Sequence, residues 1–130
     1  MNAPLVPISW GELIDKITIL EIKVERLAAP QAVVHAKHEL SLLLEALGSS
    51  AAEVAALRGE LAAVNRELWD IEDAIRRKEA LQSFDAEFIA LARAIYHRND
   101  ERARIKQAIS VSLGSGIIEE KQYVAYRDTP

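Results

Sequence analysis

A short run of the sequence places two arginines where a helix would normally bury apolar residues. The segment 94–110, AIYHRNDERARIKQAIS, has the composition of an α-helix. Steps of three and four residues from Ile95 lead to Arg98 and Arg102, so a stripe that should be apolar is charged at its centre. Guanidinium groups bind carboxylates and phosphates through paired hydrogen bonds. The pattern therefore predicts organised polar contacts inside a helical protein.

Two interpretations of these arginines stay open. In the first, they form an anion site inside a helical bundle, where they hold a carboxylate or a phosphate. In the second, carboxylates of the chain neutralise them, since 20 acidic residues accompany 16 basic ones. Removing one partner of a buried ion pair costs about 3–5 kcal/mol, so a structural network alone would explain the pattern, and we favour it. The candidate ligand-binding residues of the first interpretation are Arg76, Arg98, Asn99, Arg102, Lys106, Asp15, Lys16 and Glu72.

The sequence gives little support to metal or catalytic chemistry. Helical bundles that hold two metal ions use Glu-x-x-His motifs on facing helices, and the chain has none. His35 and His38 stand about one helical turn apart, but no acidic pattern completes a metal site around them. His97 has neighbouring acids but no nucleophile on a strained turn. We therefore predict no metal ligand, no cofactor and no catalytic residue.

The bulk composition is that of a single helical domain, residues 1–130. Hydrophobic residues make up 50% of the chain, which suffices for a core. The net charge of −4 argues against nucleic acid as a partner, because phosphate binding needs a basic surface. The N-terminal segment MNAPLVPISWGEL has no basic stretch and no long apolar run, so we predict neither a signal peptide nor a membrane span. The lack of cysteine is compatible with a cytoplasmic protein, which is our prediction.

Helix start and stop signals divide the chain into four helices and a tail. Ser9 and Glu12 have the spacing of a capping box, and Pro30 suits the first turn of a second helix. We predict helices at about 10–27, 31–47, 51–81 and 84–113, followed by a non-helical tail at 114–130.

The two long helices should pack as an antiparallel hairpin, because their connection is short. The third helix carries an apolar stripe with coiled-coil-like spacing. If the chain turns at 82–83, facing residues have numbers that sum to about 166, so Leu61 meets Ile105 and Val64 meets Arg102. The predicted fold class is all-α: an antiparallel helical bundle built on this hairpin, with a short non-helical C-terminal tail.

The apolar surface exceeds what the four helices can bury among themselves. Hairpin arms of about 30 residues measure roughly 45 Å, and two shorter helices cannot cover them fully. We therefore predict a homodimer that buries the rest of the seam. In the tail, we expect Ile117, Ile118 and Tyr123 to be at least partly buried, against their own bundle or against the second copy.

Four blocks of the sequence resemble a family of small bacterial proteins catalogued as a domain of unknown function. The blocks are GELIDKITILEIK (11–23), ELWDIEDAIR (67–76), ARAIYHRNDERARIKQAI (92–109) and GSGIIEEKQY (114–123). The resemblance implies a compact, mostly helical bacterial protein and brings no activity or catalytic residue with it. It also implies a link to the assembly of cell-envelope polysaccharide or lipopolysaccharide.

Two functions follow as hypotheses. The favoured one is a non-catalytic bacterial helical module that binds a partner protein or a small anion. The alternative is a small helical enzyme acting on an anionic metabolite, since the run 57–77 is similar to the first helix of the all-helical chorismate mutases. That helix should end before the lysine that the comparison needs. A binding module should expose an apolar patch, whereas an enzyme should have a closed pocket with unpaired arginines.

Overall fold

The protein is an all-α bundle in which two pairs of helices are layered on each other. The computed structural model describes residues 3–126, without the side chains of residues 50 and 51. The helices are α1 (Trp10–Arg26), α2 (Pro30–Leu47), η1 (Ser50–Val54, a 3-10 helix), α3 (Ala55–Ala80) and α4 (Ala86–Ser112). No strand occurs within the described range. The predicted fold class is therefore confirmed.

The observed helix ends differ from the predicted ones at two corners. The third α-helix begins at Ala55 rather than near 51, because the chain turns by 106° between α2 and α3 and does so through η1. Val54, at the end of η1, is buried in this corner. The fourth helix begins after Asp85 rather than at 84, since the Asp85 carboxylate accepts a hydrogen bond from the Phe88 N–H at 3.0 Å and caps the helix.

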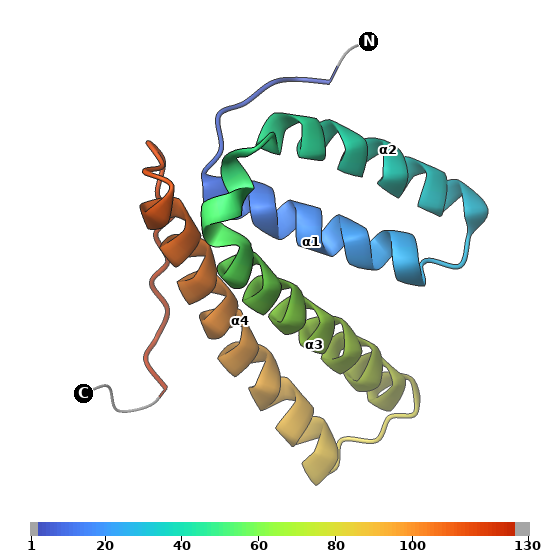
Figure 1. Cartoon of the computed structure of the whole chain (residues 1–130). Helices are drawn as coiled ribbons and strands as arrows, with labels where there is room; N and C mark the ends of the chain where they lie inside the picture. Colours follow the sequence, from blue (N-terminus) through green and yellow to red (C-terminus); the bar gives the residue numbers. More distant parts are fainter. Residues whose placement is uncertain (1–2, 127–130) are drawn as a thin grey trace.

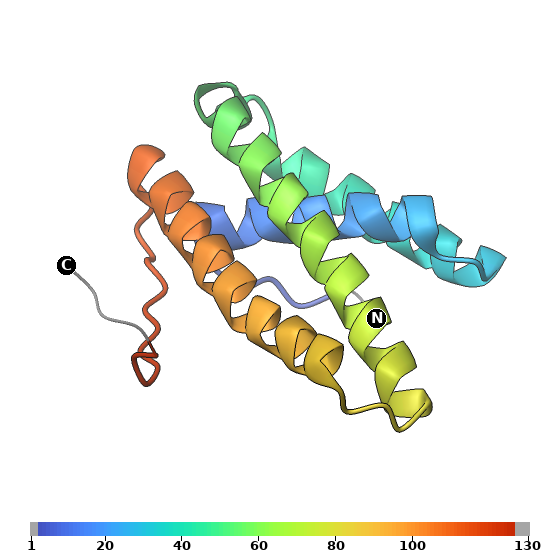
Figure 2. The ribbon, with the colours of Figure 1, turned by 90° about the horizontal axis from the view of Figure 1, so that it is seen from below.

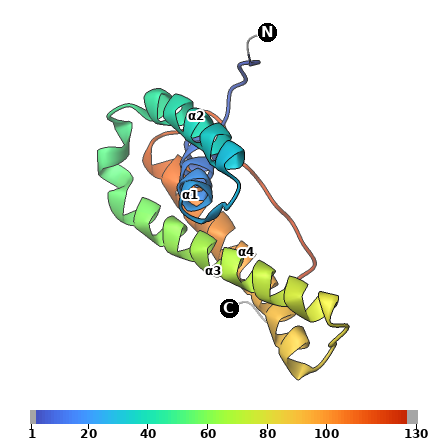
Figure 3. The same ribbon diagram turned by 90° about the vertical axis from the view of Figure 1, so that its right-hand side faces the viewer.

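The predicted hairpin is present, and α1 ties it to the rest of the chain (Figure 1). Helices α3 and α4 lie side by side and antiparallel, α1 crosses both of them, and α2 packs against α1 (Figure 2). The turn of the hairpin projects away from α1 and α2 (Figure 3). Only the half of the hairpin next to α1 is therefore covered.

The core lies where α1 crosses the hairpin. Leu61 and Ile105, which the predicted register pairs, both belong to it and are fully buried. Its buried members are Leu13, Ile14, Ile17, Leu47, Val54, Leu61, Val64, Ile105 and Ile109. By contrast, no residue from 66 to 104 is buried, although the structure describes all of them. The apolar stripe thus continues beyond the part of the hairpin that α1 covers.

The non-helical tail runs back alongside α4 (Figures 1 and 2). Its last four residues, 127–130, lie outside the described range. Ile117 and Ile118 are 40% and 36% exposed, but Tyr123 is 73% exposed. Within one chain, the expectation of burial is therefore wrong for Tyr123, because the tail places it beside Asp100 and Ala103 on the outside of α4 rather than in the core. Burial against a second copy stays a prediction.

The start of α1 is fixed against the end of α4 by a close backbone approach. A Cβ atom at Gly11 would collide with the backbone carbonyl of Lys106. The Gly11 N–H donates a hydrogen bond to the Ser110 hydroxyl at 2.9 Å, and the Glu12 N–H donates one to the Ser9 hydroxyl at 3.1 Å. Backbone donors of the first helical turn are thus satisfied by serine hydroxyls rather than by water.

This approach predicts opposite effects for two glycine-to-alanine substitutions. Gly11→Ala should destabilise the protein by about 1–3 kcal/mol or more, because the methyl group must push α1 away from α4. Gly59→Ala, inside α3 with open space around its Cβ, should stabilise it by about 0.5–1 kcal/mol through helix propensity. Urea unfolding of both variants measures the two changes. Equal effects at the two positions would contradict the close approach.

Candidate functional site

A buried carboxylate, Asp15 on α1, is the centre of the polar contacts. Its side chain is 1% exposed. Arg102 on α4 binds it with both ends of its fork: Nε lies 3.0 Å from Oδ1, and Nη2 lies 2.5 Å from Oδ2. Asn65 on α3 donates to Oδ1 at 2.9 Å and to the Thr18 hydroxyl at 2.8 Å. One carboxylate therefore joins three helices.

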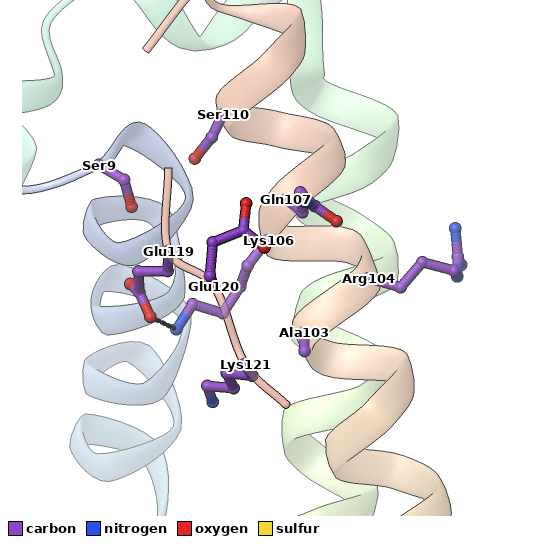
Figure 4. Close-up of a pocket in the computed structure, with 9 residues that line it drawn as sticks. All are labelled: Ser9, Ala103, Arg104, Lys106, Gln107, Ser110, Glu119, Glu120 and Lys121. Atoms are coloured by element: carbon purple, nitrogen blue, oxygen red, sulfur yellow. Dashed lines mark ion pairs between the residues drawn. The ribbon is translucent and has the colours of Figure 1, made fainter. Parts of the chain in front are cut away.

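Lys106 adds a second cation to the same interior. Its ammonium lies 2.7 Å from Glu12 Oε2 and 3.9 Å from Asp15 Oδ2. Glu119 of the tail approaches it at 3.6 Å from the outside (Figure 4). The Lys106 side chain is only 10% exposed, so its charge is compensated by protein carboxylates instead of water. We call Glu12, Asp15, Asn65, Arg102 and Lys106 the buried polar cluster.

The charges of the buried polar cluster stabilise one another. The hydrogen bonds with Asp15 raise the pKa of Arg102 above its ordinary value, against the opposing effect of burial. Burial would raise the pKa of Glu12, but the hydrogen bond with Lys106 and the charges of Lys106 and Lys16 outweigh it, so the pKa is lowered. Two carboxylates thus neutralise two cations inside the protein, and Glu119 adds a third carboxylate at the edge.

The other predicted arginines lie on the surface. Arg98 pairs with Glu67 across the hairpin at 3.1 Å, and both side chains are about half exposed, at 43% and 53%. Arg76 contacts Glu72 at 3.4 Å along α3 and is 80% exposed. Neither pair reaches the interior. The charged stripe seen in the sequence therefore divides into a buried part at Arg102 and a solvated part at Arg98.

A groove of about 520 Å³ opens beside the cluster, between α1, α3 and α4. It brings together four predicted site residues: Glu72, Arg76, Asn99 and Arg102. Its remaining lining consists of Ile19, Ile22, Asn65, Leu68, Trp69 and Asp73. We call it the α1–α3–α4 groove. Arg98 and Lys106 do not line it, and Lys16 and Asp15 line a smaller depression of about 210 Å³ that also contacts Arg102.

Sequence reasoning overlooked several residues of the cluster. The sequence pattern points to Glu12 only as part of a capping box, and it does not single out Asn65 as a site residue. The Ser9 hydroxyl does cap α1, but the Glu12 side chain reaches Lys106. A usable signal was present: Glu12, Asp15 and Thr18 repeat every three residues along a helix that is otherwise apolar on that side.

The two histidines of α2 stand apart from this site. His35 and His38 are exposed, and the His35 ring lies 3.1 Å from the side-chain amide of Gln31. Across the described residues, no group of three or more His, Asp or Glu side chains is placed to hold a metal ion. Within that same range, no single helix is both long and apolar enough to cross a membrane.

The fold and the site together define a small all-α protein whose long hairpin is tied to α1 by a buried ion-pair cluster. The chain belongs to the family of unknown function DUF6165, whose model matches residues 5–130. The resemblance to a family without an assigned function is thereby confirmed. No curated protein and no solved structure is significantly similar to the chain.

The buried pair predicts a large difference between two carboxylate-to-amide substitutions. Asp15→Asn leaves the Arg102 guanidinium without its buried counter-charge and should cost about 3–5 kcal/mol. Glu67→Gln breaks only the solvated pair with Arg98 and should cost less than about 1 kcal/mol. Chemical denaturation of both variants tests this. A cost for Asp15→Asn as small as that for Glu67→Gln would contradict the role of Asp15.

The lowered pKa of Glu12 predicts a loss of stability in acid. A carboxyl group whose folded pKa lies below its ordinary value of 4.5 stabilises the protein above that pH, and this contribution disappears as the pH falls through the folded pKa. Glu12→Gln should therefore flatten the decline of unfolding free energy below about pH 4.5. Because Glu12 is partly buried, the difference should persist in about 0.5 M salt.

Glu101 provides the matched control for this experiment. A hydrogen bond with Arg104 lowers the pKa of Glu101 as well, but that pair is on the surface. Salt should therefore remove the effect of Glu101→Gln and leave that of Glu12→Gln. Equal loss of both effects in salt would show that the Glu12–Lys106 contact is solvated.

Proposed function

We propose that this protein is a non-catalytic helical module that binds a helical segment of a partner protein in the α1–α3–α4 groove. One observation carries the proposal: the groove lining includes the apolar side chains of Ile19, Ile22, Leu68 and Trp69, while both of its arginines are already paired with carboxylates of the chain. Such a groove offers an amphipathic helix an apolar surface with polar edges.

The apolar part of the groove lining suits apolar side chains of a partner. Ile19 on α1 and Leu68 and Trp69 on α3 are each partly exposed there. Burying such apolar surface stabilises a complex by roughly 25 cal/mol per Å² before the costs of association. A tryptophan in the lining, here Trp69, is also a common source of binding energy.

The polar edges favour a protein segment over a free anion. The acids Glu72 and Asp73 balance the bases Arg76 and Arg102, so the groove lining has no net charge. Arg102 Nη1 and the Asn99 amide have no hydrogen-bond partner among the described residues. These two donors are suited to a single carbonyl or carboxylate group of a bound helix. A multiply charged metabolite would gain little, which also weighs against the alternative of a small enzyme.

The wider cellular role is predicted from the sequence alone. A link to cell-envelope polysaccharide or lipopolysaccharide assembly, a bacterial origin and a cytoplasmic location stay predictions. A scaffold that recruits another protein is compatible with all three.

Site-specific photo-crosslinking in the native host cell tests the proposed groove. A photo-reactive residue at Asp73, on the groove wall, should yield one protein adduct whose cross-linked peptide maps to a helical segment. The same residue at Glu60, exposed on α3 away from the groove, should not yield it. Asn99→Trp, an exposed change that fills the groove, should remove the adduct. An adduct that survives Asn99→Trp, or no adduct at all, would overturn the proposal.

Thermal unfolding tests the competing anion site. Phosphate or succinate at a hundredfold excess over its Kd would stabilise the protein by about 2.7 kcal/mol. We expect no rise in Tm at millimolar concentrations. A rise that Arg102→Met abolishes would instead identify the groove as an anion site.

A further inference from the structure

The non-helical tail lies along the outside of α4 and contacts the bundle at separate points. The structure describes residues 114–126 of the tail, and we call this part the strap. At its start, the Ser115 hydroxyl accepts a long hydrogen bond of 3.4 Å from the Trp10 N–H. At its middle, the Glu119 carboxylate lies 3.6 Å from the Lys106 ammonium of α4 (Figure 4). Each of these two points is a single contact.

Tyr126 holds the end of the strap on α4. Its hydroxyl donates a hydrogen bond to Asp100 Oδ2 at 2.6 Å, and its ring meets the His97 ring edge-on, with 5.1 Å between the centroids. His97, Asp100, Ala103 and Lys106 are spaced by three residues, so they form a row that runs obliquely over the surface of the helix. We call these four residues the α4 strip.

Open space remains between the strap and the α4 strip. A hollow of about 130 Å³ lies beside Lys106, and another of about 300 Å³ lies beside Asp100. Ala103 of α4 and Lys121 of the strap line both hollows. A closely packed protein interior has few voids larger than a water molecule. The strap therefore touches α4 at points and does not fill the surface beneath it.

Release of the strap leaves no buried charge without a partner. The Lys106 ammonium lies 2.7 Å from Glu12, and this pair does not need Glu119. Within the buried polar cluster, Glu12 and Asp15 already balance Lys106 and Arg102, so the charge of Glu119 is additional. The Glu119 side chain is 41% exposed, and partly exposed ion pairs contribute little to stability. The closed strap is therefore held weakly.

We infer that the strap is autoinhibitory: it occupies a binding site on the α4 strip that otherwise takes an extended segment of a partner protein with a carboxylate and a tyrosine. The strap itself shows which chemistry fits this site, since a carboxylate meets the Lys106 ammonium and a phenol meets the Asp100 carboxylate. Because the strap is tethered, its effective concentration is high, and it keeps the site closed until a partner segment competes. The inference does not rest on the α1–α3–α4 groove, because none of residues 114–126 lines that groove.

The sequence of the strap, supplied as a separate peptide, provides the first test. A fluorescent peptide of residues 115–126, SGIIEEKQYVAY, should bind the native protein only weakly, because the tethered strap competes with it. Glu119→Lys places a second ammonium beside Lys106 and releases the strap, so the Kd of the peptide should fall by about tenfold or more. Fluorescence anisotropy measures the Kd.

Glu120→Lys is the matched control, because it changes the net charge by the same amount. Among the described residues, Glu120 forms no ion pair, so its substitution should leave the Kd of the peptide near the native value. Two outcomes overturn the inference: a peptide that binds the Glu119→Lys protein no more tightly than the native one, or equal tightening by Glu120→Lys.

A pair of alanine substitutions on α4 tests where the peptide binds. Ala103→Glu, added to Glu119→Lys, places a carboxylate under the bound segment and should abolish the gain in affinity. Ala90→Glu, the same change at an exposed position of α4 outside the α4 strip, should leave the gain intact. Circular dichroism should show unchanged helicity for both, since neither alanine is buried. A gain in affinity that survives Ala103→Glu would place the peptide elsewhere and overturn the inference.

Discussion

The fork of Arg102 on Asp15 is the interaction on which the rest of the structure depends. A carboxylate that is 1% exposed is tolerable only if its charge and its lone pairs are satisfied, and here Arg102 and Asn65 satisfy them. Because these groups come from α1, α3 and α4, the requirement fixes how α1 crosses the hairpin. An apolar core alone would allow α1 to slide along the stripe, whereas a two-point ion pair permits one position.

A second constraint acts at the start of α1. Gly11 lets the helix approach the Lys106 carbonyl, and the same Lys106 then extends its ammonium to Glu12. Backbone contact and ion pair thus reinforce each other at one end of α4. The two ends of the hairpin therefore differ. Helix α1 covers the half of the hairpin next to it closely and leaves residues 66–104 without a buried position. The proposed α1–α3–α4 groove lies where the covered part of the hairpin meets the open part.

Acids of the chain neutralise the arginines that the sequence offers as an anion site. Arginines in a helical bundle suggest anion binding when considered alone, but Arg102, Arg98 and Arg76 face Asp15, Glu67 and Glu72 of the chain, respectively. These arginines therefore form ion pairs within the chain, and the pair between Arg102 and Asp15 helps to fix how the helices are arranged. In the groove, what remains available to a partner is apolar surface around Trp69.

Local patterns in the sequence determined the helices, the hairpin and its register. The Ser9 cap, the apolar stripe through Leu61 and the arginines that interrupt it are all readable because they depend on spacing along one helix. The partner of Arg102 was not readable, since Asp15 lies 87 residues away and competes on paper with many other acids. Likewise, the spacing of Ser9 and Glu12 predicts a capping box, but it cannot reveal that the Glu12 carboxylate forms an ion pair with Lys106. Those choices belong to the tertiary structure, because only the crossing angle and position of α1 decide which charges share the interior.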